Sequence, residues 1–399
     1  MFKNILFITL FGVSAYADMA SFFQAALNTL KYNKTYTLTK QANKTAQSAI
    51  TYKKYTDFGA DIAYTKTYAK LLPNAPGSFG TTDVALHDTI DIFGKSDYKI
   101  QALRFDTQME KSRLDLKKEQ LFVALANMIA LYNKTKAQLE LREKLYDAQH
   151  RIYEKLTTLE QNGNITEIEV LRFKNTLTTL HTSIVAMRQE LSKMGTQLRL
   201  YAPNEVIPKL TQTKIRYTKE AFLQHNPKEL LNRLDAKKLL TESKGVKSRY
   251  IPTLDLFAAY QKLEDPTSYG DNHSFGAALH LPLSGGDLKE AEALKVTALG
   301  KETQSIQYKI AREKEYIAHL QAYKNAKKQL EILERSRKDF EKSEATIQKA
   351  YLKQYVDFNT YLQVLRQALD VKSHIAALQN EMRKEATIIN AIASGKVYE

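Results

Sequence analysis

The chain has 399 residues and a net charge of +15, from 59 Lys and Arg against 44 Asp and Glu, and it contains no cysteine. The lack of cysteine excludes disulfides, thiolate metal sites, a catalytic thiol and a lipid-modified N-terminal Cys. Nucleic-acid binding would suit the positive charge. However, the basic residues are dispersed among acidic ones, with no basic run and no known nucleic-acid motif, which favours a solvated helix surface.

Residues 1–17 have the pattern of a secretory signal peptide. Lys3 gives the positive start, Ile5 to Val13 form a short apolar stretch, and Ala15-Tyr16-Ala17 is a small-x-small cleavage site. The alternative is a retained membrane anchor, but the apolar stretch is shorter than the roughly 20 residues that cross a bilayer as a helix. We therefore expect the mature chain to begin near Asp18.

Two pairs of segments, at about 52–93 and about 250–283, alternate apolar and polar residues as β-strands with one apolar face do. Each strand is about ten residues long, which is the length of a transmembrane β-strand. The alternative is a soluble hairpin packed on its own helices. The signal peptide, the 23 Tyr and the 16 Phe favour the membrane, because aromatic girdles flank the lipid band of outer-membrane barrels.

The four strands of one chain are too few to close a barrel, since the smallest such barrels have about eight. Open strand edges are not tolerated in lipid, so several copies have to associate. Three copies would supply an even number of strands, but the strands alone do not choose between two, three and four copies.

A long helix is predicted from about Asp97 to Glu160, where Pro and Gly are absent and apolar residues recur every seven residues. Such a helix would be on the order of 90 to 100 Å long. Residues 161–164 (Gln-Asn-Gly-Asn) would reverse the chain, and a return helix would follow to about Leu200. Thr166 and Glu169 have the spacing of a capping box at its start.

The second half repeats this plan, with a long helix from about 287 to 350 and a return helix from about 357 to 393. Its reversal, near residues 352–355, lacks the Gly of the first half, so we expect a more regular backbone there. Residues 163–171 match residues 353–361 at an offset of 190 positions, and residues 91–97 match 282–288 at 191. Because the two pairs of matching segments have nearly the same offset, they indicate a duplicated unit of two strands and two helices.

Three segments are therefore predicted: a signal peptide, a first structural repeat and a second one. They cover residues 1–17, 18–205 and 206–399. The two repeats are predicted to contribute strands at about 52–93 and about 250–283, and helical hairpins at about 97–200 and about 287–393.

The residues of the junctions and of the first reversal resemble the TolC-type outer-membrane efflux channel family. They are Asp91-Ile92-Phe93-Gly94, residues 281–286 leading into residues 289–292, and the turn at residues 163–171. The resemblance covers nearly the whole predicted mature chain. It implies an α+β membrane fold, in which a trimeric 12-stranded outer-membrane β-barrel, with four strands per chain, continues into a long α-helical coiled-coil periplasmic barrel.

The same resemblance implies a homotrimer in the outer membrane of a Gram-negative bacterium, in contact with outer-membrane lipid. It would be the passive exit duct of a tripartite efflux or type I secretion system. A periplasmic adaptor (membrane fusion) protein would open it, and an inner-membrane transporter would power it. No cofactor and no nucleic acid is implied.

The resemblance also assigns roles to the two helical turns. Those that would meet the adaptor are Gly163, Asn164, Ile165, Lys353, Gln354 and Tyr355. Those that would line a periplasmic aperture are Glu169, Asp357, Asn359 and Leu362. Family members often carry acidic residues at the positions that Asn359 and Leu362 occupy here, so we expect the aperture to be polar and apolar rather than anionic.

Motifs for catalysis are absent from the sequence. The eight histidines do not have metal-ligand spacing, and there is no phosphate-binding loop and no Gly-x-Ser-x-Gly elbow. We therefore expect a protein that is not an enzyme. The alternative to an exit duct is a soluble exported coiled-coil adaptor or scaffold of the periplasm, but paired strands in both halves favour the duct. The sequence does not identify the exported substrate.

Overall fold

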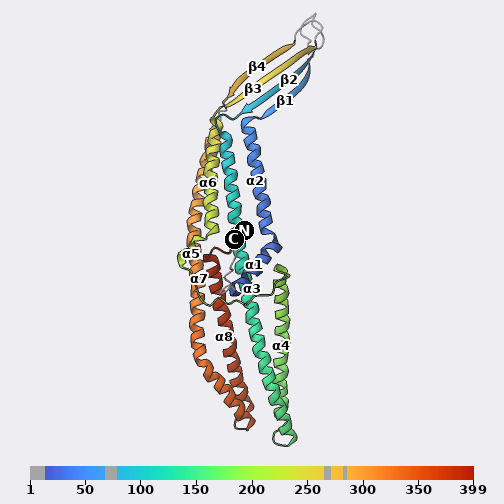
Figure 1. Cartoon of the computed structure of the whole chain (residues 1–399), viewed down its shortest axis with the longest axis vertical. Helices are drawn as coiled ribbons and strands as arrows, with labels where there is room; N and C mark the ends of the chain where they lie inside the picture. Colours follow the sequence, from blue (N-terminus) through green and yellow to red (C-terminus); the bar gives the residue numbers. More distant parts are fainter. Residues whose placement is uncertain (1–13, 68–78, 265–270, 282–284) are drawn as a thin grey trace, which may run out of the picture. The chain divides into compact units, whose positions relative to one another are not determined.

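The computed structural model describes residues 14–67, 79–264, 271–281 and 285–399 (Figure 1). Residues 1–13 of the predicted signal peptide, residues 68–78 and 265–270 between the paired strands, and residues 282–284 lie outside the described residues. The chain forms two compact units, and each takes segments from both halves of the sequence. The hairpin unit comprises residues 1–33, 115–226 and 310–399, and the sheet unit comprises residues 34–114 and 227–309.

The sheet unit contains four antiparallel strands in the order β1-β2-β3-β4. Their bounds are Phe58–Thr67 (β1), Phe79–Ile90 (β2), Thr253–Glu264 (β3) and Asn272–His280 (β4). Within the described residues, the outer edges of β1 and β4 have no strand partner. The strands thus make an open sheet that each half of the chain supplies with one hairpin.

The alternating pattern predicted from the sequence divides the sheet into two different faces. Ile62 pairs with Val84, and Val84 pairs with Tyr260, so the three side chains lie on one face. That apolar face also carries Phe58, Tyr64, Leu86, Leu254, Leu256, Phe275 and Leu279. The opposite face carries mostly small and polar residues, among them Asp61, Asp83, Thr89, Asp255 and Ser274. Thr89 donates a hydrogen bond to Asp255 at 2.7 Å on this face.

Helix α2 (Tyr32–Tyr55) corrects the predicted start of the first strand. Residues 52–55 are helical, and the strand begins only at Phe58. Asp88 holds the residues between the end of α2 and the start of β1. Its carboxylate accepts hydrogen bonds from the backbone N–H of Asp57 at 2.8 Å and from the Thr56 hydroxyl at 3.2 Å. In the second half of the chain, α6 (Pro227–Lys247) is followed by a short 3-10 helix, η1 (Ser248–Tyr250), which precedes β3.

The long helices are close to their predicted bounds. They are α3 (Lys95–Gln161), α4 (Glu167–Tyr201), α7 (Gly285–Leu352) and α8 (Phe358–Ala393). Three further helices complete the set with α2: α1 (Ser14–Leu30), α5 (Lys219–Gln224) and α6. None of these four helices is predicted from the sequence. None of the helices in the described parts of the chain is both long and apolar enough to cross a membrane.

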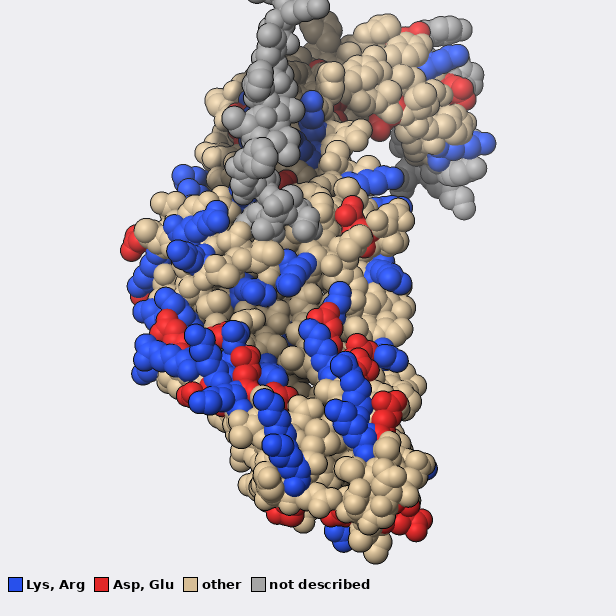
Figure 2. Space-filling model, turned by 60° about the horizontal axis from the view of Figure 1, so that its bottom comes forward, with Lys and Arg blue, Asp and Glu red and all other residues tan. Residues whose placement is uncertain are grey.

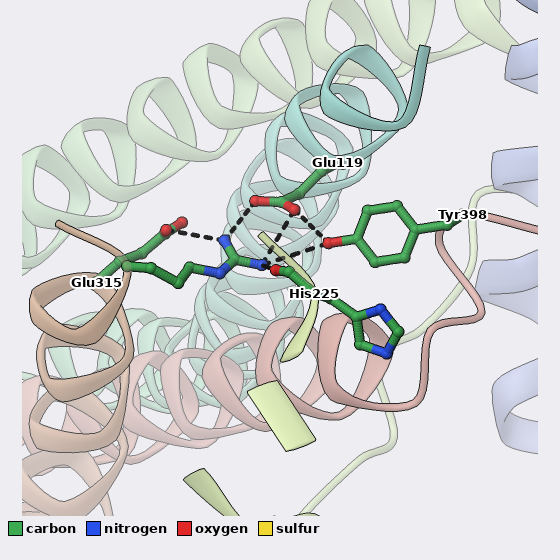
Figure 3. Close-up of polar contacts among 5 residues, drawn as sticks. Glu119, His225, Glu315 and Tyr398 are labelled. Carbon is green, nitrogen blue, oxygen red and sulfur yellow. Dashed lines mark hydrogen bonds and ion pairs between the residues drawn. The ribbon is translucent and has the colours of Figure 1, made fainter. Parts of the chain in front are cut away.

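The core of the hairpin unit gathers side chains from α1, α3, α5 and α8. Phe22, Leu125, Phe222 and Ile389 are fully buried there. Beside it lies a buried ion pair (Figure 3): the Arg312 guanidinium donates to the Glu119 carboxylate at 2.5 and 3.1 Å. Arg312 also donates to the His225 carbonyl oxygen at 2.7 Å and to the Tyr398 hydroxyl at 3.3 Å. This network ties the last residues of the chain to α3 and α7.

Candidate functional site

The two helical turns, where the adaptor contact is predicted, have the same backbone geometry. In the first turn Gly163 has φ = +71°, and its N–H donates to the Glu160 carbonyl at 2.8 Å. In the second turn Gln354 has φ = +60°, and its N–H donates to the Tyr351 carbonyl at 2.9 Å. Each following residue donates to a carbonyl five positions earlier, which completes a Schellman motif.

This equivalence corrects two expectations. The structural counterpart of Gly163 is Gln354 rather than Lys353, so the offset at the turns is 191 residues and not 190. The expectation of a more regular backbone at the second turn is wrong, because Gln354 adopts the left-handed conformation that Gly163 adopts. A residue with a side chain reaches that conformation at a cost of about 1 to 2 kcal/mol.

The return helices begin with different N-caps. The Asp357 carboxylate accepts hydrogen bonds from the backbone N–H groups of Asn359 at 2.8 Å and Thr360 at 3.0 Å. Hydrogen bonds from the Thr360 side chain and backbone lower the pKa of Asp357. Thr166 is the N-cap of α4, but its side chain makes no capping hydrogen bond, so the predicted capping box is wrong.

The two turns lie next to each other within the hairpin unit. The Gln354 side-chain amide donates a hydrogen bond to the Asn164 carbonyl oxygen at 3.0 Å. Tyr355 leaves 77% of its surface exposed, and Gly163 and Lys353 are exposed as well. Ile165 packs against a cluster of aromatic side chains behind the turns. Of the predicted contact residues, the structure therefore joins Asn164 to Gln354 and leaves the others at the surface or on the cluster.

The aromatic cluster joins the two hairpins just behind the turns. Phe173 of α4 is fully buried, and its ring lies 6.4 Å from Tyr351, 6.3 Å from Tyr361 and 5.8 Å from Phe358. Tyr351 and Tyr361 stack in parallel with their centroids 4.5 Å apart. Burial raises the pKa of Tyr351 to about 12, and it raises the pKa of Tyr361 further. Both hydroxyls are therefore neutral at physiological pH.

The residues predicted to line the aperture have different surroundings. Asp357 is occupied as an N-cap, and Leu362 packs against the aromatic cluster. Asn359 is exposed, and Glu169 is half-buried near Tyr351, whose pKa its charge helps to raise. An aperture formed by these four residues stays a prediction.

Sequence reasoning missed the aromatic cluster, although the sequence carries a signal for it. Tyr351, Phe358 and Tyr361 are spaced by seven and three residues across the second turn, and Phe173 is ten residues after Gly163. Aromatic residues at this spacing on both sides of a reversal meet when the two helices pack together. Contact between the two hairpins, however, joins residues that are far apart in the sequence, and one hairpin alone does not predict it.

No protein-family model matches the sequence, and no curated protein matches it. Solved structures match it over nearly the whole chain. The outer membrane protein VceC from Vibrio cholerae is 14% identical, with a TM-score of 0.73, over 95% of this chain and 96% of VceC. The outer-membrane channel OprN is 13% identical, with a TM-score of 0.79, over 96% of this chain and 91% of OprN. The CmeC outer membrane channel from Campylobacter jejuni is 14% identical, with a TM-score of 0.74, over 95% of this chain and 86% of CmeC. The chain therefore has the fold of TolC-type outer-membrane channels, as its junction and turn residues predict.

Proposed function

We propose that the chain is one subunit of a passive exit duct in the outer membrane of a Gram-negative bacterium. Three copies would close a twelve-stranded barrel, and their helices would form a tunnel through the periplasm. A periplasmic adaptor would open the tunnel, and an inner-membrane transporter would supply the energy. The observation that carries this proposal is the open sheet, which has one apolar face and, among the described residues, two edges without a strand partner.

The apolar face of the sheet is unsuited to water. Ile62 is 77% exposed and Phe275 is 89% exposed within one chain, and neither is covered by a helix. Large exposed apolar surfaces of this kind mark contact with a membrane or another protein. A lipid-facing sheet also needs every edge N–H and C=O paired, and pairing β1 with β4 of a neighbouring copy achieves that.

The opposite face suits a water-filled interior. Small and polar residues lie there, as they do inside membrane β-barrels. Together with the absence of catalytic motifs from the sequence, this supports a passage for solutes rather than an enzyme. OprN and CmeC, which share the fold, are described as outer-membrane channels.

The helical turns suit contact with a second protein. Tyr355 and Lys353 present an aromatic ring and a charge at the surface of the second turn, while the hydrogen bond between Gln354 and Asn164 holds both turns together. An adaptor that binds these turns would act on both hairpins at once.

Membrane fractionation and gel migration test the duct directly. We expect the protein in the outer-membrane fraction, with an unheated sample migrating as a trimer and a heated one as a monomer. The purified trimer should also produce stable conductance steps in a planar lipid bilayer. Recovery as a soluble periplasmic monomer would contradict the duct and favour the adaptor or scaffold alternative.

A further inference from the structure

Helix α7 carries a row of basic side chains that its duplicated counterpart α3 lacks. The turns at the ends of the two helices are equivalent at an offset of 191 residues, so each position on α7 has a counterpart on α3. Positions spaced alternately by three and four residues follow one face of a helix. On α7 the row holds six basic residues and one acid: Lys324, Lys328, Glu331, Arg335, Lys338, Lys342, Ala345 and Lys349. On α3 the same positions hold two basic residues and three acids: Asn133, Ala137, Glu140, Lys144, Asp147, Arg151, Glu154 and Thr158.

The basic side chains of the α7 row are available to a partner. All six are exposed, and within the described part of the chain none has a carboxylate within 4.0 Å. The acids around the row are engaged by other bases: Lys327 lies 4.0 Å from Glu331, and Arg337 lies 3.2 and 3.4 Å from Glu334 and Glu341. Asp339 lies beside the row and reduces its charge only locally.

The positive charge of this face is visible on the surface of the molecule. Figure 2 shows Lys and Arg side chains on the side where α7 lies in Figure 1, with acidic side chains among them. The row runs from Lys324 to Lys349, which corresponds to about 38 Å along a helix. Exposed Ile317 and Ile332 lie alongside it, at 40% and 56% exposure. The face thus combines a long line of charge with apolar side chains.

Helices of a second copy of this chain are poor partners for the row. Helix α4 carries five basic and three acidic residues, and α8 carries four and three, so each would bring like charge. The row on α3 has three acids against two basic residues, which is too small an excess of negative charge to match six basic side chains. Small anions would use the charges but would leave the isoleucines uncovered. A helix with acidic and apolar residues on one face would satisfy both, and its length could follow the whole row.

We propose that this row on α7 docks an acidic α-helix of a partner protein, and that α3 does not. This proposal rests on the proposed function, in which the partner protein is the periplasmic adaptor. Each exposed ion pair contributes only about 0.2 to 1 kcal/mol, so several have to act together. The row would mainly select and orient the partner, and binding should weaken as salt screens the charges.

Matched charge reversals on the two helices test this directly. One variant combines Arg335→Glu with Lys342→Glu on α7, and the control combines Lys144→Glu with Arg151→Glu at the equivalent positions of α3. The probe is a labelled synthetic helix of about four heptads with Glu and Leu on one face, and a second peptide has Lys in place of Glu. Fluorescence anisotropy measures binding to the purified full-length protein in detergent.

We expect the acidic peptide to bind the unaltered protein and to bind the α7 variant at least about tenfold more weakly. Binding to the α3 variant should change by less than about twofold, and the Lys peptide should not bind. Equal losses in the two variants would overturn the proposal. So would equally tight, row-dependent binding of unstructured polyglutamate or of anionic lipid vesicles, since either result would assign the row to polyanions or to a lipid surface.

Conductance of the same preparations separates this inference from the proposed function. Both variants should conduct in planar bilayers as the unaltered protein does, because the row lies outside the sheet. Normal conductance with no selective peptide binding would overturn the docking row alone. Absent conductance of the unaltered protein would contradict the duct, while the peptide measurements would still decide whether the row binds an acidic helix.

Discussion

Glu119 and Arg312 show how much one buried pair constrains the hairpin unit. Their side chains are 8% and 4% exposed, and the Phe222 ring lies 4.3 Å from the guanidinium carbon. Burying two charged groups costs desolvation free energy, so close hydrogen bonds are needed to offset that cost. Tyr398 contributes one of them, and burial, with the Glu119 charge, raises the pKa of its hydroxyl, which therefore stays protonated as a donor.

Removing Glu119 should therefore be far more harmful than removing an exposed acid on the same helix. We expect Glu119→Ala to lower the free energy of unfolding by about 3 to 5 kcal/mol, because Arg312 is left charged and buried. Glu143→Ala, which breaks the exposed pair with Arg188, should cost less than about 1 kcal/mol. Urea unfolding followed by circular dichroism measures both. Similar losses would show that the buried network is not a major stabilising element.

Substitutions at two glycines with open surroundings distinguish the effect of backbone strain from the effect of side-chain packing. A Cβ would meet nothing within 4 Å at either Gly163 or Gly300, but only Gly163 has a positive φ. We expect Gly163→Ala to destabilise the first turn by about 1 to 2 kcal/mol, and Gly300→Ala to stabilise α7 by about 1 kcal/mol.

Amide hydrogen exchange around each position measures these two effects locally. Exchange should become faster near residue 163 and slower near residue 300. If the proposed function holds, adaptor binding should weaken only for the Gly163 variant, while insertion of the sheet is unchanged. Slower exchange at both positions would mean that the first turn does not need its left-handed conformation.

At the scale of elements, the aromatic cluster predicts that the contact between the two hairpins depends on pH. Burial raises the pKa of Tyr351 to about 12, above the usual value near 10. A raised pKa of a tyrosine means that the folded state holds the proton more tightly. The stabilisation is therefore complete below pH 10 and is lost as the pH rises from 10 to about 12.

We expect the paired turns to separate in that alkaline range before the rest of the hairpin unit unfolds. Tyrosinate absorbance should appear together with faster amide exchange at residues 351–361. A Tyr351→Phe/Tyr361→Phe variant removes the two hydroxyls and keeps the rings, so its turns should resist the same pH. Identical pH profiles of the variant and the unaltered protein would show that these tyrosines do not control the contact.

The sequence predicts the long helices and the strands because each carries a local pattern. Heptads over α3 and α7 and period-two alternation over β2 and β3 are strong signals, and the structure confirms them. Helix α2 was missed because Thr and Lys dominate its sequence and few of its residues are strongly apolar, so its helical pattern is weak, and none of its residues is buried. The equivalence of Gly163 and Gln354 was missed because Gln is not a typical left-handed residue.

Contacts between distant segments account for the rest of what sequence reasoning did not predict. The hydrogen bond from Gln354 to Asn164 joins residues 190 positions apart, and Arg312 and Glu119 are 193 apart. No local pattern specifies which hairpin residues meet, because that depends on how two long helices align. The contrast between the basic row on α7 and its counterpart on α3 likewise depends on the offset of 191 residues that the two turns define.

At the scale of the whole molecule, the two faces of the sheet allow one more prediction, which concerns assembly in the membrane. Ile62 and Ala63 are neighbours in the middle of β1, and their side chains point to the apolar and the polar face respectively. If the proposed function holds, we expect Ile62→Lys to reduce the inserted, heat-modifiable trimer strongly, because a Lys on the lipid face near mid-membrane would cost about 2 to 4 kcal/mol in each copy. Ala63→Lys places the same charge in the same strand but toward water, and it should insert normally while changing the ion selectivity of the pore. Refolding into liposomes and comparing unheated with heated gel migration measures insertion, and bilayer recordings measure selectivity. Equal insertion of the two variants would contradict a lipid-facing apolar surface.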